Sequence, residues 1–516
     1  MVVVYHKNNR IVKVVSGQNS FLPFDDRALI SEALYQLAVR YPKTKIVWCK
    51  EELQGYLNLK VIETVFHHNK MMLSYNPGQI DFLGRKIGYV EESPFIKINK
   101  KISHPTWQMS STVGVVHASL FLEIKNKIKM DADFDYYLNS VAKVCMPLGL
   151  LCYSEPKLLN AFEGSIVYTQ TSIYTLFKFV KQHYKMRWQI LLFLNLMVFE
   201  KQFPLLPFIF SIFYKNRKNN KLHLDTIPVQ STLKTTSDRT IDVIIPTIGR
   251  KKYLYDVLQD LASQTHLPIN VILVEQNTLP NSASELDYLT TGKWPFAIKH
   301  NFTHQAGACN ARNLALSQVK SEWVFLADDD IRIENNFIEK VLDQITTFGV
   351  KAVSVKCYQK ENRLEEKIIF QWPNFGSGCS FVHNDLLFNM KFNMSFEFGF
   401  CEDTDFGMQL RNQGADVLYL PEPSILHLKA PIGGFRTKPQ LQWQSDIVQP
   451  KPSPTIMLYQ ILHNTKEQRL GYKTILFFKY YKRQKIKNPI RYYLNFQKQW
   501  VRSVFWANQL KQQNEV

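Results

Sequence analysis

The spacing of hydrophobic positions divides the chain into two regions of alternating short strands and helices. In residues 1–165, apolar runs such as VVVYH, KIVWC and VGVVHASLF alternate with helix-spaced stretches such as ALISEALYQLAVR. In residues 241–440 the runs IDVIIPT, INVILVE and EWVFLA are separated by the helical patterns YLYDVLQDLASQT and ACNARNLALSQV. Such alternation predicts a mostly parallel sheet with helices on both faces. We therefore expect an α/β fold in both regions.

Between these regions the pattern changes to basic and aromatic residues. The stretch YTLFKFVKQHYKMRW leads into the apolar runs ILLFLNLMVF and FPLLPFIFSIFY, each about a dozen residues long. A transmembrane helix needs ~20 apolar residues, and joining the runs would bury Glu200 and Lys201 at roughly 2.5 to 3.5 kcal/mol each. The pattern favours a helical hairpin that rests on an anionic membrane surface. It leaves open a buried pair of helices between domains and a true membrane span.

Shifts in composition give the expected domain boundaries. The Ser/Thr-rich stretch TIPVQSTLKTTSDRT is typical of a linker. Near its end the chain carries a second stretch in which Lys and Arg are interleaved with Tyr, Phe and Trp. We predict an α/β domain over 1–165, a basic amphipathic helical segment over 166–225, a linker over 226–240, a second α/β domain over 241–440 and a basic aromatic helical tail over 441–516.

Charge and cysteine usage bear on the location of the protein. The 516 residues carry a formal net charge of +19, which attracts nucleic acid, anionic membranes or phosphate-bearing substrates. Because the excess charge is interleaved with large apolar side chains, we expect an anionic membrane surface as partner and no nucleic acid. The 7 cysteines form no CxxC pair, and the N-terminus lacks the apolar region of a signal peptide. We expect a cytoplasmic protein, peripheral on the cytoplasmic face of the membrane.

Three consecutive carboxylates follow the apolar run EWVFLA. Asp328, Asp329 and Asp330 repel one another, so a positive partner is expected. Ligands of α/β sheets bind at the carboxyl ends of strands, and Mg²⁺ or Mn²⁺ takes carboxylate oxygens while keeping positions for water and phosphate. The triplet therefore indicates a metal and diphosphate site. A solvated acidic turn or the start of a helix is the alternative.

Polar side chains that suit a nucleotide follow the other predicted strands. Hydrogen-bonding groups after two of the strands are of the kind that hold a nucleobase and ribose. A helix start with a nearby guanidinium, as after Gly307, receives anions well. Each feature is weak by itself, because a single such arginine is more often a surface ion-pair residue. The residues concerned are Pro246, Thr247, Gly249, Arg250, Glu275, Gln276, Asn277, Arg312 and Asn313.

Taken in order, these segments resemble the catalytic domain of the family-2 glycosyltransferases. The matching stretches cover about 200 residues and are VIIPTIGR, VILVEQN, AGACNARNLAL, FLADDDI, FGSGCSFV, FGFCEDTDFGMQLRNQGADVLYLPEP and ILHLKAP. The resemblance implies a Rossmann-like glycosyltransferase A fold and a nucleoside diphosphate leaving group. It also implies a metal held by a DxD-type motif, inversion at the anomeric carbon, and a catalytic base from a downstream Glu-Asp pair.

Carried over residue by residue, the resemblance assigns Asp328 and Asp330 to the metal and diphosphate and Asp329 to the ribose or sugar. The metal implied is Mn²⁺ or Mg²⁺. Family members commonly have an aspartate where this chain has Glu275, so recognition of the base is less closely specified, and we expect uridine. The nucleotide-binding positions fall on Pro246, Thr247, Arg250, Glu275 and Arg312.

Two downstream motifs complete the expected site. Direct displacement needs a base for the proton of the attacking hydroxyl, and by resemblance Asp403 is that base while Glu402 orients the acceptor or the base. A helix start that is merely rich in acids is the alternative. His427 falls where family members place a histidine that completes the metal site, although a lone histidine is usually structural. The following stretch KAPIGGFRTK suggests a lid over the diphosphate in which Arg436 contributes to donor binding.

The N-terminal region echoes the later motifs in order and spacing. The stretch MDADFDYYLNSVAKVCMPLGLLCYSEPKLL parallels CEDTDFGMQLRNQGADVLYLPEPSIL, and the closing strands end in Glu155–Pro156 and Glu422–Pro423. The region lacks a counterpart of the acidic triplet, so metal-dependent transfer is not expected there. We interpret residues 1–165 as a degenerate glycosyltransferase-like domain, with chance similarity between α/β domains as the alternative.

The leading interpretation is an inverting glycosyltransferase of the hexosyl or N-acetylhexosaminyl class that works in polysaccharide biosynthesis. It would use a nucleotide sugar, preferably a UDP-sugar, and a hydroxyl of a glycan or lipid-linked saccharide. A sugar nucleotidyltransferase is an alternative, but it needs a glycine-rich phosphate loop after the first strand, and PTIGRKK is a poor match. A non-catalytic binder of glycan or nucleic acid is disfavoured by the intact acidic motifs.

Overall fold

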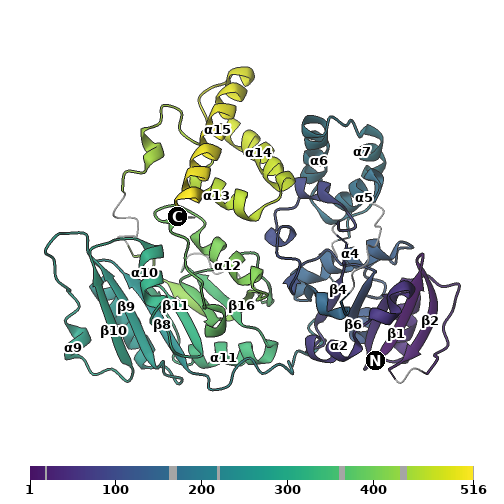
Figure 1. The fold of residues 1–516 in the computed structure, drawn as a ribbon, viewed down its shortest axis with the longest axis horizontal. Helices are drawn as coiled ribbons and strands as arrows, with labels where there is room; N and C mark the ends of the chain where they lie inside the picture. The colour runs from purple at the N-terminus through teal and green to yellow at the C-terminus, as the bar shows by residue number, and fades with distance from the viewer. Residues whose placement is uncertain are drawn as a thin grey trace. The chain divides into compact units, whose positions relative to one another are not determined.

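The computed structural model describes residues 1–17, 20–78, 80–161, 171–217, 221–359, 367–430 and 439–514. The chain forms two compact units, each with its own sheet (Figure 1). The N-terminal unit comprises Met1–Leu233 with Asn464–Arg483, and the C-terminal unit comprises Lys234–His463 with Gln484–Val516. Part of the predicted helical tail therefore belongs to each unit.

The sheet of the C-terminal unit has the strand order β10-β9-β8-β11-β15-β13-β16-β12, with β14 paired to β16. Its first four strands are parallel, whereas β15 runs antiparallel to both β11 and β13. The sheet is thus mixed, and the prediction of a mostly parallel sheet is correct only for these four strands and for the pair β13–β16. The strand β15 returns beside β13, and an antiparallel neighbour does not need the crossover helix that a parallel one requires. The strands are β8 (Ile241–Thr247), β9 (Asn270–Gln276), β10 (Ala297–Thr303), β11 (Trp323–Ala327), β12 (Ile331–Arg332), β13 (Ala352–Tyr358), β14 (Phe370–Gln371), β15 (Cys379–His383) and β16 (Leu418–His427).

The elements of this unit follow the apolar pattern of the sequence. Helix α11 (Phe337–Phe348) buries Val341, Leu342 and Ile345, which recur at helical spacing. Strands β8, β9 and β11 are buried along nearly their whole length, as parallel strands covered on both faces are. The other helices are α8 (Lys251–Ala262), α9 (Tyr288–Thr291), α10 (Ala308–Leu316), α12 (Glu402–Asn412), α13 (Pro454–His463) and α15 (Pro489–Asn514).

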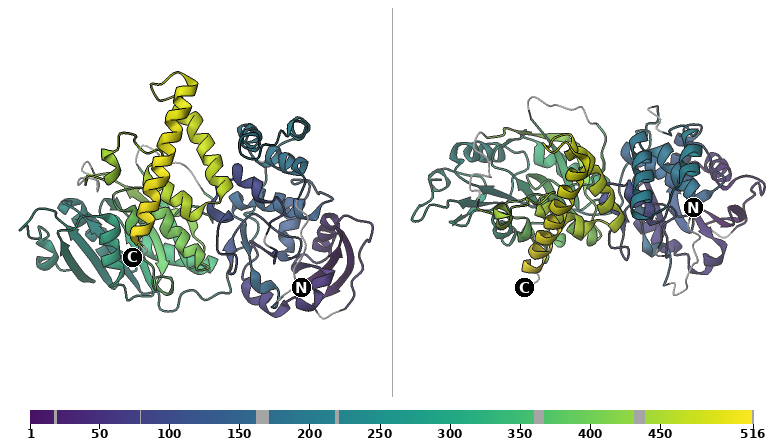
Figure 2. Two further views of the ribbon diagram at one scale, coloured as in Figure 1. Left: turned by 45° about the horizontal axis from the view of Figure 1, so that its top comes forward. Right: turned by 90° about the horizontal axis from the view of Figure 1, so that it is seen from above.

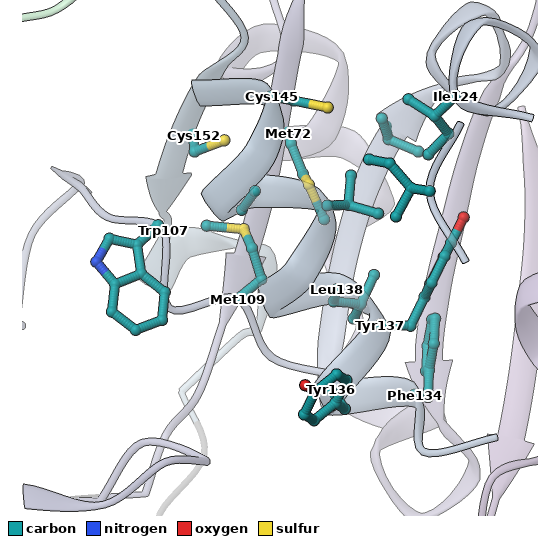
Figure 3. Close-up of a cluster of buried hydrophobic side chains, with 14 of the residues drawn as sticks. Met72, Trp107, Met109, Ile124, Phe134, Tyr136, Tyr137, Leu138, Cys145 and Cys152 are labelled. Carbon is teal, nitrogen blue, oxygen red and sulfur yellow. The ribbon is translucent and has the colours of Figure 1, made fainter. Parts of the chain in front are cut away.

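The sheet of the N-terminal unit has the strand order β2-β1-β3-β6-β4-β7-β5 and is also mixed. Aromatic and sulfur-containing side chains fill much of its core, and Figure 3 shows Met109, Phe134 and Tyr136 among them. The strands are β1 (Val2–Lys7), β2 (Arg10–Ser16), β3 (Lys45–Lys50), β4 (Met71–Tyr75), β5 (His104–Pro105), β6 (Val113–His117) and β7 (Leu151–Ser154). The helices around them are α1 (Ile30–Arg40), α2 (Leu59–Val65), α3 (Ala118–Ile124) and α4 (Phe134–Cys145).

The two sheets share an arrangement of five strands. In the N-terminal unit β1 is parallel to β3, β6 is antiparallel to β3 and β4, and β4 is parallel to β7. In the C-terminal unit β8 is parallel to β11, β15 is antiparallel to β11 and β13, and β13 is parallel to β16. The five strands also follow the same order along the chain, and a helix, α4 or α12, precedes the last of them.

A helical segment completes the N-terminal unit. It consists of α5 (Ile173–His183), α6 (Met186–Phe199) and α7 (Leu205–Ile212), together with α14 (Lys466–Tyr481) from the distant end of the chain. Helix α5 packs on α6 and α7, and α14 packs on α6. Among the helices described by the structure, none combines the length and the apolar character that crossing a bilayer requires.

Candidate active site

A cavity of about 470 Å³ lies where strands β8, β9 and β11 of the C-terminal unit end. Parallel strands place their carboxyl ends at one edge of a sheet, so residues far apart in sequence meet there. The cavity is also bordered by the start of α10, the start of α12 and the end of β16. The residues on its wall that the sequence singles out are Pro246, Thr247, Arg250, Gln276, Arg312, Asp328, Asp329, Asp330, Glu402 and His427.

Asp328, Asp330 and His427 form a group that fits a metal ion. The short strand β12 pairs with β16 so that Ile331 lies opposite His427, and His427 Nε2 lies 3.1 Å from Asp330 Oδ1. One ligand atom from each of the three residues lies within 4.8 Å of the other two. Two carboxylate oxygens and an imidazole nitrogen suit Mn²⁺ or Mg²⁺ and leave coordination positions for a substrate phosphate.

The protonation of this group follows from its contacts. Burial acts to raise the pKa of Asp330, but hydrogen bonds from His427 and from the Ala430 N–H, at 2.9 Å, hold that pKa below its usual value. The hydrogen bond to Asp330 raises the pKa of His427. Asp330 and His427 thus each favour the charged form of the other.

Asp329 faces β8 instead of the metal group. Its Oδ2 accepts a hydrogen bond of 2.7 Å from Thr247 Oγ1, and its Oδ1 accepts one from Arg250 Nη1. Arg250 also lies 3.2 Å from Asp330 Oδ2. Burial raises the pKa of Asp329 to about 6, although Arg250 and Thr247 act in the opposite direction. The middle acid of the triplet therefore connects the loop after β11 to the end of β8.

Arg312 lies between the metal group and the acids of α12. The guanidinium is buried, and its Nη2 lies 3.3 Å from Asp328 Oδ1. Burial acts to lower the pKa of Arg312, but Asp328 and Asp403 raise it and prevail. Its Nε and Nη1 are buried without a hydrogen-bond partner among the described residues. The residue Arg312 lies on the cavity wall, where its guanidinium places a positive charge beside Asp328.

The start of α10 is already occupied by a carboxylate that the sequence motifs do not reveal. Glu397 accepts hydrogen bonds from the backbone N–H groups of Cys309, at 3.1 Å, and Asn310, at 2.8 Å. A Cβ on Gly307 would lie 2.3 Å from Glu397 Oε2, and the backbone of Gly307 has a φ of +144°. Glycine is therefore required at position 307. The helix start that was expected to receive an anion receives Glu397.

The two acids at the start of α12 differ in their surroundings. Glu402 lies on the cavity wall, and burial together with the charge of Asp403 raises its pKa to about 7. Asp403 accepts a hydrogen bond from Ser377 Oγ. Burial raises the pKa of Asp403, while Arg312 and Ser377 act to lower it. Ser377 belongs to the matched stretch FGSGCSFV, but its hydrogen bond to Asp403 is visible only in the folded structure.

Glycine 378 lets Asp328 reach its position. A Cβ at this residue would lie 2.0 Å from Asp328 Oδ2, so a larger residue would displace the carboxylate from the metal group.

Asp405, two residues after Asp403, is buried and is not among the residues on the cavity wall. It accepts a hydrogen bond of 2.6 Å from His463 and so connects α12 to α13.

Two residues expected at the site, Glu275 and Asp403, are not among the residues on the cavity wall. Glu275 is not on the cavity wall: it accepts a hydrogen bond from the Glu285 N–H, at 3.1 Å, and lies 2.9 Å from His300 Nε2. Its neighbour Gln276 faces the cavity and accepts a 2.7 Å hydrogen bond from the Gly307 N–H. Lys429 from the expected lid lies on the wall, whereas Arg436 falls outside the described residues.

Comparison with known proteins gives matches in the same region. Residues 242–402 match the family model described as Glycosyl transferase family 2. Glycosyltransferase GlyG of Streptococcus pneumoniae serotype 4 is 28% identical over 105 residues, which are 20% of this chain and 35% of that protein. An uncharacterized glycosyltransferase of Haemophilus influenzae is 30% identical over 105 residues, which are 20% of this chain and 34% of that protein. The matched region thus spans about a third of the length of each relative.

Solved structures give distant similarities. The crystal structure of S. aureus TarS has a TM-score of 0.32 and 18% identity, and the match covers 46% of this chain and 42% of TarS. The structure of S. aureus TarS 1-349 in complex with UDP-GlcNAc has a TM-score of 0.32 and 17% identity, with 45% and 70% covered. GalNAc-T7 with UDP, GalNAc and Mn2+ has a TM-score of 0.31 and 12% identity, with 37% and 44% covered. Similarities of this size carry no argument about the site.

Proposed function

Since residues 242–402 form a glycosyltransferase family 2 domain, we propose that the chain is an inverting, metal-dependent glycosyltransferase. It moves a hexosyl or N-acetylhexosaminyl group from a nucleoside diphosphate sugar, with UDP as the nucleotide, to a hydroxyl of a glycan or lipid-linked saccharide. The observation that carries this proposal is the meeting of a metal group (Asp328, Asp330 and His427) and Glu402 on the wall of one cavity, with Asp403 next to Glu402 and held by Ser377.

Asp328, Asp330 and His427 are the residues that would hold the cation. Mn²⁺ or Mg²⁺ bound there supplies Lewis-acid stabilisation of the departing diphosphate. The Arg312 guanidinium lies beside Asp328 on the cavity wall, so its positive charge stabilises the same phosphates. Thr247, Arg250 and Gln276 border the nucleotide end of the cavity.

Asp403 acts as the general base. The acceptor oxygen bonds to the anomeric carbon as the bond from that carbon to the diphosphate oxygen breaks, and the proton of the hydroxyl passes to the Asp403 carboxylate. One displacement of this kind inverts the anomeric carbon. Ser377 fixes the orientation of Asp403, and Glu402, on the cavity wall, orients the acceptor hydroxyl.

We also propose that the C-terminal unit has the glycosyltransferase A fold and that the N-terminal unit is a degenerate copy of it. The shared order and direction of five strands support this. A hydrogen-bonded pair supports it further. Ser111 donates to Asp135 through its N–H, at 2.7 Å, and through its Oγ, at 2.8 Å, as Ser377 Oγ donates to Asp403. Both serines stand two residues before the β6 or β15 strand, and both acids lie in the first turn of α4 or α12.

Strand register identifies the counterpart of the acidic triplet. Ala327 at the end of β11 pairs with Cys379, the first residue of β15. Cys49 of β3 pairs with Val113, the first residue of β6. The residues that replace Asp328, Asp329 and Asp330 are therefore Lys50, Glu51 and Glu52. A lysine in the first position disfavours a divalent cation, so transfer is assigned to the C-terminal unit alone.

The location proposed is the cytoplasmic face of a membrane. All seven cysteines are free thiols, as suits a reducing compartment. Turnover assays on soluble and lipid-linked acceptors distinguish the two proposed acceptor classes.

A donor screen tests the proposed reaction. The purified chain is incubated with UDP-, GDP- and dTDP-sugars, with and without Mn²⁺, and release of nucleoside diphosphate is measured. The proposal predicts Mn²⁺-dependent release of UDP from one of the UDP-sugars and its loss in Asp403→Asn, with a smaller loss in Glu402→Gln. No turnover of any donor, full activity of Asp403→Asn, or release of pyrophosphate from a nucleoside triphosphate and a sugar phosphate would overturn it. A larger loss in Glu402→Gln than in Asp403→Asn would assign the base to Glu402.

A further inference from the structure

In the α6–α7 hairpin several polar residues are buried and several large apolar residues are exposed. Ser211 is the single polar residue of α7, and it is 1% exposed. By contrast Phe210 is 55% exposed and Phe213, directly after the helix, is 81% exposed. Soluble proteins usually bury apolar side chains and expose polar ones. The arrangement is therefore the reverse of that of a helix that faces water.

Helix α6 repeats this reversal. Its Gln189 and Asn195 are completely buried. Gln189 Nε2 donates to Ser211 Oγ and, at 3.2 Å, to the Phe208 carbonyl. Asn195 Oδ1 accepts a 2.6 Å hydrogen bond from Thr474 of α14. The polar side chains thus connect the helices, and Ile190 and Val198 of α6 are exposed, whereas its buried leucines are Leu191, Leu192 and Leu196.

We call the exposed apolar side chains of α6, α7 and the residues that flank them the hairpin surface. The helices lie side by side at one end of the N-terminal unit (Figures 1 and 2), and the contacts of α7 with α5 and of α6 with α7 keep them there. Contiguous exposed apolar patches on soluble proteins mark protein or membrane interaction sites. The hairpin surface consists of Ile190, Val198, Phe203, Leu205, Leu206, Ile209, Phe210, Ile212 and Phe213.

Exposed positive charge lies at the ends of the hairpin helices, whereas Lys178 and Arg217 pair with Asp131. Residues 171–217 contain seven Lys and Arg residues and one acid, Glu200, which accepts a 2.6 Å hydrogen bond from the Tyr89 hydroxyl. Lys185, Lys201 and Lys215 are exposed at the ends of the helices. A cavity of about 540 Å³ next to Lys215 is also lined by Lys129. The surroundings therefore suit an anionic partner.

We infer that the hairpin surface docks on an anionic lipid bilayer. The apolar side chains enter the boundary between headgroups and acyl chains, the surrounding lysines contact lipid phosphates, and neither helix crosses the membrane. A second copy of the chain is a poorer occupant, because a symmetric contact would bring the same basic residues of both copies together. This inference does not depend on the proposed reaction, since it concerns a different surface.

Vesicle sedimentation of the full chain tests the inference. Vesicles of phosphatidylcholine alone and vesicles that also contain phosphatidylglycerol are compared, without substrate. We expect binding to the anionic vesicles and a decrease of at least about tenfold in partitioning for the double variant Phe210→Glu and Phe213→Glu. Phe21→Glu is the matched control, because Phe21 belongs to the same unit and is 77% exposed; it should bind like the wild type. The triple variant Lys185→Gln, Lys201→Gln and Lys215→Gln should lose its preference for anionic vesicles.

Several results would overturn the inference. One is an absence of wild-type binding to either vesicle. Another is binding that the double glutamate variant retains, because charge alone would then account for it. A third is a wild-type oligomer that this variant converts to a monomer, with no vesicle binding. Thermal unfolding and donor turnover of each variant verify folding, so a failed vesicle experiment remains distinguishable from failure of the proposed function.

Discussion

The two sheets of this protein share five strands in the same order but differ at the ends of those strands. In the C-terminal unit, β11 is followed by three acids that border an open cavity. In the N-terminal unit, aromatic rings occupy the corresponding region. Phe134 lies 5.4 Å from His6 and 5.8 Å from Trp48, measured between ring centroids, and all three side chains are buried. The two units share the strand arrangement, and the few residues after each strand determine whether that edge of the sheet can hold a ligand.

A retained acid illustrates the same difference. Asp135 and Asp403 both accept hydrogen bonds from a serine at the start of the neighbouring strand. Asp403 also has Arg312 nearby, which connects it electrostatically to the metal group. Burial and the charge of Asp133 raise the pKa of Asp135, whereas the hydrogen bonds of Ser111 and, more weakly, Lys50 act to lower it. We interpret Asp135 as a structural remnant and Asp403 as the functional acid.

The largest effect should come from the metal group. Asp330→Asn removes a metal ligand and the hydrogen-bond partner of His427. The loss of transition-state stabilisation should be several kcal/mol, so turnover should fall on the order of 10⁴-fold. The register-matched control in the N-terminal unit is Glu52→Gln, which should leave turnover unchanged. Steady-state kinetics with Mn²⁺ measure both. Equal losses in the two variants would show that both sheets contribute to catalysis.

The next largest effect concerns the paired acid. Asp403→Asn should lower kcat roughly 10² to 10⁴-fold, because the acceptor hydroxyl loses its base. Asp135→Asn should have wild-type kcat and KM, since its carboxyl lies in the other unit. Single-turnover assays of the two variants make the comparison. Loss of turnover in Asp135→Asn with an intact fold would contradict the assignment of that residue as a remnant.

The pH dependence of turnover should follow the raised pKa values of the C-terminal acids. A base must be ionised to accept a proton, so kcat/KM should rise with pH, by about tenfold per unit below the pKa of the base. Burial raises the pKa of Asp403, so the midpoint should lie above the ordinary aspartate value of about 4. Glu402→Gln should retain this limb if Asp403 is the base. Disappearance of the limb in Glu402→Gln would transfer the role to Glu402.

A smaller effect, the dependence of stability on pH, should differ between the two units. Burial lowers the pKa of His6 and His67 to about 4 and that of His68 to about 3, all in the N-terminal unit. These histidines stay neutral in the fold but bind protons below about 6.5 when unfolded. The free energy of unfolding should therefore fall between pH 6.5 and pH 4, by roughly 1 to 2 kcal/mol per histidine at pH 5.

Calorimetry at pH 7 and pH 5 measures this loss, and hydrogen exchange assigns it to a unit. Amides of β1 and β3 should lose protection at pH 5 before those of β8 and β11. Earlier loss in β8 and β11 would contradict the expected difference between the units.

Local patterns predicted the parts of the site that depend on local sequence. The run EWVFLA gave strand β11, whose end places the acids at the cavity, and spacing gave the helix that carries Glu402. His427 was assigned to the metal site by resemblance, and pairing between β12 and β16 brings it next to Asp330. Such features can be predicted from the sequence because nearby residues determine where strands end and helices begin.

Features that depend on long-range packing were not predictable. Glu397 is far in sequence from the helix start it occupies, and no motif marks it. The antiparallel insertion of β15 depends on which strands pair, and apolar runs do not encode that choice. The side chain of Asp329 faces Thr247 although its neighbours face the metal group. In each case the information lies in contacts between distant segments.

The number of nucleotide sites per chain tests the central claim most directly. Calorimetric titration of the full chain with UDP in the presence of Mn²⁺ should give one site per chain. Asp330→Asn should abolish that site, and Glu52→Gln should leave it unchanged. Two sites per chain, or a single site that survives Asp330→Asn, would contradict the claim that only the C-terminal sheet binds the donor.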